Sequence, residues 1–326
     1  MKKKLKDLWV VTKKTAIAWK EADPFRQSAV IAYYAIFSIP ALLVIVIACA
    51  GLAFGEEAVQ GQISSQISSA MGEDTAKQME EVIAKASDHK ASVFAAIVSI
   101  VTLILGATGV FTQLQVSLNQ IWEVRITAKK MWLKSLKDRL FSFGLILSIG
   151  FLLLVSLLLT TMLSAFGDWI KAHLPDFMLY VFFLINFLVS FGVITVLFAL
   201  MFKILPDAII RWKDVWIGAG VTAILFIIGK FLLGIYFGKA EPGSTYGAAG
   251  SIVLLMLWVS YSCMIVFFGA EFTKQYSVFK GDEIKPKNGA ELILPDEDAQ
   301  TVKDRKEAVN KVDDRGQSST AQNKRS

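Results

Sequence analysis

The chain has 326 residues, of which 54% are hydrophobic, and it carries a formal net charge of +6. Soluble globular proteins usually contain about 45–50% apolar residues, so this composition argues against an ordinary soluble domain. The two cysteines, Cys49 and Cys263, both lie in apolar runs, which excludes a disulfide framework and a cysteine-rich metal site.

Residues 1–28 form a basic amphipathic segment that we expect to lie on a membrane surface as a helix. It lacks the pattern of a cleaved secretory signal, because the apolar run that follows is far too long for one. Apolar and small residues recur along it at helical spacing: Leu5, Leu8, Trp9, Thr12, Ala16 and Trp19. Asp23 and Pro24 then predict a helix N-cap followed by proline at the first helical position.

Six stretches of about 20 or more mostly apolar residues follow, and a helix of that length can cross a hydrocarbon core about 30 Å thick. They cover residues 29–54, 93–116, 141–166, 177–202, 215–237 and 251–272. The sequence therefore predicts an all-α, polytopic membrane protein with a six-helix membrane domain over residues 29–276.

Between the first two spans, residues 55–92 are acidic and polar, and they predict a small helical extracytoplasmic cap. Ile63, Ile67 and Met71 share one helical face, and a capping box from Thr75 to Gln78 predicts a second short helix.

The last segment, residues 277–326, is predicted to be a disordered charged tail. No aromatic residue follows Phe279, and such a composition cannot bury enough apolar surface to offset the entropy of ordering.

Basic residues lie mostly on one side of the predicted membrane domain. Of 34 Lys and Arg residues, 28 lie in the two termini and the connectors on their side, and five lie on the other side. The positive-inside rule places both termini in the cytoplasm of a bacterial cell. The positive charge therefore predicts anionic membrane lipids on the cytoplasmic side as partners, and not nucleic acid. The sequence leaves an oligomer possible.

Lys230 is the sharpest anomaly, because it lies in an apolar span directly after Gly229. A lysine at the centre of a membrane helix costs about 2.5–3.5 kcal/mol on insertion scales. Either Lys230 faces the bundle interior or a wet cavity as part of a solute pathway, or its stem reaches the nearby outer interface.

The segment that precedes the sixth span consists of small residues, where a bulky helix start would be expected. It includes Tyr246, Gly247, Gly250 and Ser251. Irregular backbone at membrane depth must be buried in protein or line water, so this segment is either part of a substrate or gating site or a tight turn between helices.

Glu271 and Asn119 are candidates at the cytoplasmic ends of their spans. Glu271 is either an ordinary interfacial carboxylate or the partner of a base, for which we considered Lys203, Arg125 and Arg139. Asn119 belongs to a polar helix face with Gln113 and Gln115, and such faces more often join helices than bind ligands.

Catalytic motifs are missing from the sequence. His89 and His173 have no partners at metal-ligand spacing, and the chain has no G-x-S-x-G elbow, P-loop or dinucleotide-binding fingerprint. We therefore predict that the protein is not an enzyme, that it has no catalytic residues, and that it needs no metal or other cofactor.

Seven short motifs, in order, resemble the YihY/BrkB family of bacterial integral membrane proteins over about residues 15–276. They are the Tyr33-Tyr34 pair before Pro40, Leu118-Asn119-x-Ile121-Trp122, Leu205-Pro206 before Arg211-Trp212-Lys213-Asp214, Gly218-Ala219-x-x-Thr222-Ala223, Gly229-Lys230, Tyr246 to Ser251, and Gly269-Ala270-Glu271. The resemblance implies a multi-pass protein of the cytoplasmic membrane with a role in transport. An older family label, ribonuclease BN, finds no support, because the chain lacks the clustered His and Asp ligands that such a nuclease needs.

Two hypotheses on function follow. The first is a transporter or exporter of a lipid-like or anionic solute, with Lys230 receiving the anionic group. The second is a non-transporting membrane scaffold or envelope-assembly protein that binds through residues 55–92 and the tail.

Overall fold

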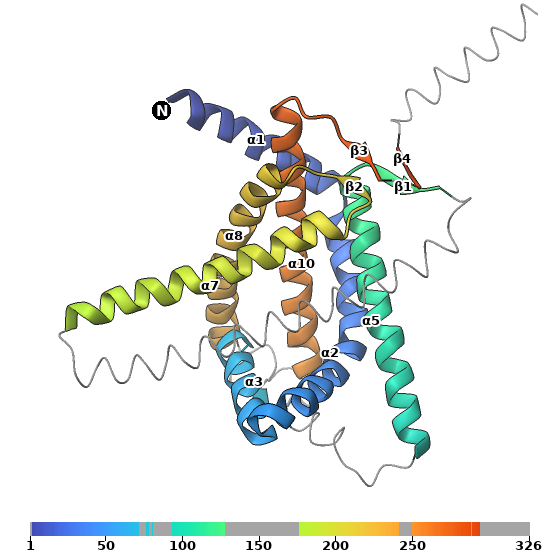
Figure 1. Cartoon of the computed structure of the whole chain (residues 1–326), viewed down its shortest axis with the longest axis vertical. Coiled ribbons are helices and arrows are strands. Elements are labelled where there is room, and N and C mark those ends of the chain that lie inside the picture. The colour runs from blue at the N-terminus through green and yellow to red at the C-terminus, as the bar shows by residue number, and fades with distance from the viewer. Residues whose placement is uncertain are drawn as a thin grey trace, which may run out of the picture.

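The computed structural model describes residues 2–71, 76–77, 80, 93–127, 176–240, 250–287 and 289–293. This part of the chain is mostly helical, and the longer helices gather into one bundle (Figure 1). The helices are α1 (Lys2–Glu21), α2 (Pro24–Phe54), α3 (Glu56–Met71), α5 (Val93–Ile121), α7 (Asp176–Ile204), α8 (Trp212–Ala240) and α10 (Gly250–Phe279).

Five of the six predicted spans coincide with α2, α5, α7, α8 and α10, and the third, 141–166, lies outside the described residues. Among the described residues, three helices contain stretches long and apolar enough to cross a membrane: Phe187–Ile204, Trp212–Phe237 and Ile252–Phe279. The six-span count therefore stays a prediction. Helix α10 continues seven residues beyond the predicted end of the sixth span, to Phe279.

Four short strands, each of two or three residues, add to a described chain that is mostly helical, as predicted. Strand β1 (Val124–Ile126) pairs antiparallel with β4 (Ala290–Leu292), and β2 (Ala208–Ile209) pairs antiparallel with β3 (Lys285–Pro286). The two pairs join segments that are far apart in the sequence. The prediction of a disordered tail from residue 277 is accordingly wrong for residues 277–287 and 289–293, and residues 294–326 lie outside the described part.

The bundle has two distinct ends. Figure 1 shows α1 and the four strands gathered at one end, and α3 at the opposite end. We call these the strand end and the α3 end. Helix α8 begins at the strand end and α10 ends there, while α7 meets the bundle through its carboxyl-terminal half, where Phe198, Ala199 and Phe202 are buried.

The chain reverses sharply between α2 and α3 at Gly55, whose φ of 86° lies in the region that favours glycine. Helix α3 then packs against α2, α8 and α10. Its apolar face is used as predicted: Ile63 packs with Val59 and Ile47, and Ile67 joins the main core. Residues 76–77 and 80 are helical, but Thr75 and Gln78 of the predicted second cap helix lie outside the described residues.

Helices α8 and α10 approach each other through a reciprocal pair of glycines and threonines. A Cβ atom on Gly218 would overlap the Thr273 hydroxyl, and one on Gly269 would overlap the Thr222 hydroxyl. Each threonine hydroxyl donates to the carbonyl of the glycine four residues earlier in its own helix, at 2.7 Å. Two of the family-like motifs are thus explained by close helix packing.

Helix α1 packs against α10 with a face rotated from the predicted stripe. Val11 and Thr15 are buried, and the Trp19 indole donates to the Met264 carbonyl at 3.1 Å. Trp9, which the stripe included, is exposed. Helical spacing alone could not tell a face that packs on protein from one that packs on lipid.

The N-cap prediction at Asp23 is correct in position but not in mechanism. Its side chain makes no capping hydrogen bond and instead accepts from Arg26 at 2.7 Å. Pro24 occupies the first turn, as expected.

Candidate functional site

The predicted site residues fall into two groups at different depths of the bundle. Lys230 and Gly229 lie on α8 toward the α3 end, whereas Glu271 and Asn119 lie toward the strand end, on α10 and α5. Tyr246 and Gly247 lie outside the described residues. Gly250 is buried at the start of α10, and Ser251 follows it with its side chain outside the described part. The glycine-rich segment as a whole therefore stays a prediction.

Lys230 is exposed on α8 among large apolar side chains. A shallow hollow of about 440 Å³ lies beside it, lined by Ile227, Lys230, Phe231, Gly234 and Ile235. Phe231 is 68% exposed. The described residues supply no ion pair or hydrogen bond to the ammonium. This arrangement offers one positive charge on an otherwise apolar surface.

Gly229 lies on a different side of α8 from this hollow. A Cβ atom there would come within 2.6 Å of Ile265 and 2.8 Å of Tyr261, both on α10. Successive residues of an α-helix are turned by about 100°. Close packing of Gly229 on α10 therefore turns Lys230 away from that helix, so the sequence pair Gly229-Lys230 combines a packing position with an exposed charge.

Glu271 is buried, and its partners differ from the predicted ones. Gln275 donates to its carboxylate at 2.8 Å, and the Lys274 ammonium lies 3.8 Å away. Lys274 in turn pairs with Glu123, beyond the end of α5, at 2.8 Å. The lysine therefore joins α10 to the end of α5.

The bases that were considered for Glu271 have other partners. Lys203 donates to the Ile210 carbonyl and lies over the Trp212 ring, and Arg125 pairs with Glu291 at 2.8 Å. Arg139 lies outside the described residues. The prediction failed because it searched the connectors and overlooked a lysine one helical turn away on α10 itself.

Asn119 is buried and binds the turn between α7 and α8 through both ends of its amide. It donates to the Asp207 carboxylate at 2.9 Å and accepts from the Asp207 backbone amide at 2.7 Å. Gln115, one turn earlier, donates to the same carboxylate at 3.3 Å. The expectation that this polar face joins helices is supported by these contacts.

Two buried carboxylates were missed by the sequence reasoning, Asp207 and Asp214. Asp214 is fully buried in the first turn of α8, with Lys280 at 3.5 Å and Arg211 at 3.8 Å. Neither of its oxygens has a hydrogen-bond partner among the described residues. Asp214 ends the motif Arg211-Trp212-Lys213-Asp214, and Asp207 directly follows Leu205-Pro206. An acidic residue next to a predicted span was the available signal.

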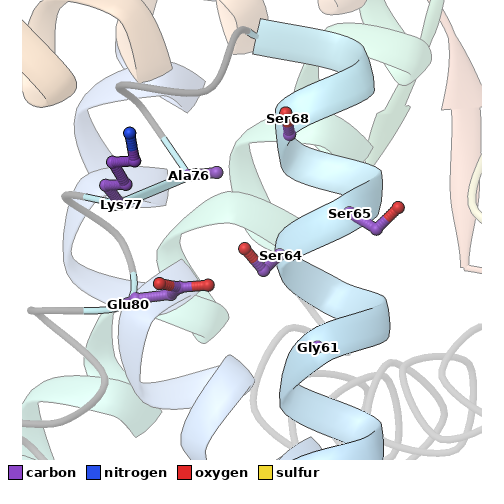
Figure 2. Close-up of a pocket in the computed structure, with 7 residues that line it drawn as sticks. All are labelled: Gly61, Ser64, Ser65, Ser68, Ala76, Lys77 and Glu80. Atoms are coloured by element: carbon purple, nitrogen blue, oxygen red, sulfur yellow. The ribbon is translucent and has the colours of Figure 1, made fainter.

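A second hollow, of about 410 Å³, lies at the α3 end. Its lining is polar and small: Gly61, Ser64, Ser65, Ser68, Ala76, Lys77 and Glu80. Figure 2 shows Glu80 extending toward Ser64, while Ser65 points to the other side of α3. The site lies within the predicted cap and can offer hydroxyl groups and charges of both signs to a polar partner.

Within the described ranges, no group of three or more His, Cys, Asp or Glu side chains is arranged to hold a metal ion.

A family profile described as Virulence factor BrkB matches residues 17–292. This match ends with the residue that closes β4. It thus takes in the paired strands as well as the helices.

Curated relatives carry the name UPF0761 membrane protein. The protein from Tolumonas auensis is 29% identical over 54% of this chain and 56% of its own length. Those from Verminephrobacter eiseniae and Idiomarina loihiensis are 28% and 26% identical over 67% of this chain, and over 49% and 72% of their own lengths. The chain thus spans about half the length of the first two relatives. No solved structure matches the chain.

Proposed function

We propose a function from the premise that this chain belongs to the virulence factor BrkB family, whose relatives are named as bacterial membrane proteins. The protein is a transporter or exporter of a lipid-like or anionic solute in the cytoplasmic membrane. Lys230 receives the anionic group of that solute, and the apolar lining of the hollow accommodates its hydrophobic part.

The exposed position of Lys230 is the observation that carries this proposal. An ammonium at membrane depth with no partner among the described residues is costly, and polypeptides keep such charges mostly where function needs them. The neighbouring side chains Ile227, Phe231 and Ile235 offer apolar surface beside the charge. An anion with an acyl chain would satisfy both features, whereas a small hydrated anion would use only the charge.

A variant pair tests the role of the charge. Lys230→Met removes the ammonium while keeping the length of the side chain, and Lys230→Arg keeps a positive charge. Ile224→Met, at an exposed position of the same helix outside the hollow, serves as the matched control. Purified full-length variants are reconstituted into liposomes, and three probes are measured: fluorescent phosphatidylglycerol, fluorescent phosphatidylcholine and inorganic phosphate.

We expect Lys230→Met to slow movement of the phosphatidylglycerol probe by about tenfold or more, because a hydrogen bond to a charged group contributes about 1.5–3 kcal/mol. Lys230→Arg should retain part of the rate. Faster movement of phosphate than of phosphatidylglycerol would favour an anionic solute over a lipid. Equal rates for the wild type and Lys230→Met with every probe would contradict the proposal.

The cytoplasmic partners in this account are anionic lipids at α1. Its exposed surface carries Trp9 and Ile17 together with Lys13, Lys14 and Lys20, and the Lys13 ammonium lies 5.6 Å from the Trp9 ring centroid. Exposed aromatic and basic side chains on one amphipathic helix are typical of binding at an anionic membrane interface.

A second candidate function is a non-transporting scaffold or envelope-assembly role through the predicted cap. The polar hollow on α3 favours it, because Ser64, Ser68 and Glu80 could bind a polar partner. The combined variant Ser64→Ala, Ser68→Ala, Glu80→Gln should then abolish function in cells, while Lys230→Met leaves it intact. The opposite pattern would support transport.

A further inference from the structure

The segment after α10, residues 280–293, crosses the strand end and contacts the connectors of other helices. We call it the strap; residue 288 lies outside its described part. Its strand β3 pairs with β2, which lies between α7 and α8, and its strand β4 pairs with β1, which follows α5. One short segment therefore links the ends of four helices, α5, α7, α8 and α10.

Lys287 of the strap binds the carboxyl-terminal end of α7. Its ammonium donates to the carbonyls of Pro206 at 2.6 Å and Ile204 at 3.1 Å, and its backbone amide donates to the Asp207 carbonyl at 2.7 Å. The last carbonyls of a helix have no partners within it and carry a partial negative charge, so a lysine there is favourable.

Charged pairs complete the attachment of the strap. Arg211 before α8 pairs with Asp282, Lys280 lies 3.5 Å from Asp214, and Arg125 pairs with Glu291. Both side chains of the last pair are about half exposed or more, at 65% and 48%. Exposed pairs of this kind contribute little to stability.

The strap is therefore held by weaker interactions than the helices beneath it. Its strands are two and three residues long, it has no aromatic side chain to bury, and its packing on the main core is through the partly buried Ile284. The α8–α10 contact, in contrast, is fully buried at Thr222 and Thr273. Segments with few buried apolar contacts open locally at lower free energy than the core.

Polar groups that could bind water lie beneath the strap. The Asn119–Asp207 pair and the Lys274–Glu123 pair join separate helix ends there. Because both pairs are polar, water can replace their contacts when the strap opens.

We propose that the strap is a releasable closure of the strand end, and that its release admits water to the polar pairs between α5, the α7–α8 turn and α10. This proposal is independent of the solute and of Lys230. It makes the arrangement described above the closed state of this end of the bundle.

A disulfide lock tests the proposal on the full-length protein. Ile126 and Ala290 face each other in the β1–β4 pair, and the flanking bonds from Thr127 to Gly289 and from Ile293 to Glu123 make this a non-hydrogen-bonded pair, in which side chains lie closest. The variant is Ile126→Cys with Ala290→Cys, in a background with Cys49 and Cys263 replaced by alanine. Ile126→Cys alone in that background is the control.

Hydrogen exchange in lipid nanodiscs is measured with and without reductant. Without the lock, we expect amides of 285–292 and of the 205–211 turn to exchange together, about tenfold or more faster than those of α10. Oxidation should slow both segments by about tenfold, and reductant should reverse the effect. Exchange of the strap as slow as that of α10 would overturn the proposal, and so would a lock that leaves the turn unaffected. Failure of the disulfide to form would contradict the pairing itself.

Discussion

Lys274 stands between an exposed and a buried carboxylate, so the two should differ in their contributions to stability. Glu271 is buried and, among the described residues, keeps only Gln275 if the lysine is removed, whereas the Glu123 side chain is 58% exposed. We expect Lys274→Met to lower the free energy of unfolding by about 3 kcal/mol, near the lower limit for breaking a buried pair. Glu123→Gln should cost less than about 1 kcal/mol.

Unfolding of these variants by SDS in mixed micelles measures both effects. The double variant Lys274→Met, Glu271→Gln should recover much of the loss, because no uncompensated charge is then buried. Equal losses for Lys274→Met and Glu123→Gln would show that the burial of Glu271 carries no electrostatic cost.

Lys280 should make the stability of the folded protein depend on pH in the alkaline range. The Tyr276 hydroxyl, which lies beside it, and the Asp214 carboxylate raise the pKa of Lys280 above its ordinary value of 10.5. A group whose pKa is higher in the folded protein than in the unfolded chain stabilises the fold at pH values below its ordinary pKa. That stability is lost as pH rises through the folded pKa.

The thermal unfolding temperature of the wild type should therefore fall more steeply above pH 10.5 than that of Lys280→Met. Lys280→Arg, which stays charged throughout this range, should remove the extra slope while keeping the ion pair. Parallel profiles for all three proteins would mean that Lys280 does not contribute.

Single residues were the hardest level to predict from the sequence. Lys230 could be singled out because a charged residue within a long apolar run is anomalous whatever the fold. The partner of Glu271 was overlooked although Lys274 lies one helical turn away, and the contact of Lys274 with Glu123 could not be predicted because it depends on packing of the end of α5 beside α10. The burial of Asp214 in the first turn of α8 could not be inferred from the sequence.

At the scale of the helices, the sharpest prediction concerns the contact between α8 and α10. Gly218→Ala places a methyl group against the Thr273 side chain, at 2.8 Å from its Cβ atom. Overpacking of this kind costs about 1–3 kcal/mol. Gly220→Ala, two residues along the same helix, has nothing within 4 Å and should be neutral or stabilising by up to about 1 kcal/mol.

The two alanine variants are compared by SDS unfolding, as above. Adding Thr273→Ala to Gly218→Ala should restore part of the lost stability, because it removes the atoms that overlap. A loss for Gly220→Ala as large as that for Gly218→Ala would point to helix propensity or lipid contact in place of packing against α10.

Helices were predictable because apolar runs of membrane length are a strong signal, and five of the predicted runs begin and end within seven residues of the ends of observed helices. The strands were not, because segments such as Lys285–Pro286 and Ala290–Leu292 are too short and too charged to show an alternating pattern. These strands form by pairing with exposed backbone groups at the ends of α5 and α7, which only the folded bundle supplies.

At the scale of the whole molecule, membrane residence and family are established, and the orientation is a prediction from charge. The strand end gathers the basic residues of α1, of the 203–214 connector and of the strap. The α3 end carries the serine-lined hollow and lies on the side that we expect to face away from the cytoplasm. In this orientation the strap faces the cytoplasm, and the apolar hollow that contains Lys230 lies within the bilayer.

The most direct test labels single cysteines from one side of the membrane. In a background without Cys49 and Cys263, Ser65→Cys on α3 and Glu283→Cys in the strap, both exposed positions, are expressed separately in bacteria, and intact spheroplasts are treated with a maleimide that cannot cross membranes. We predict that the Ser65→Cys protein is labelled at once and that the Glu283→Cys protein is labelled only after the membrane is permeabilised. Labelling of Glu283→Cys in intact spheroplasts, with Ser65→Cys protected, would contradict the account.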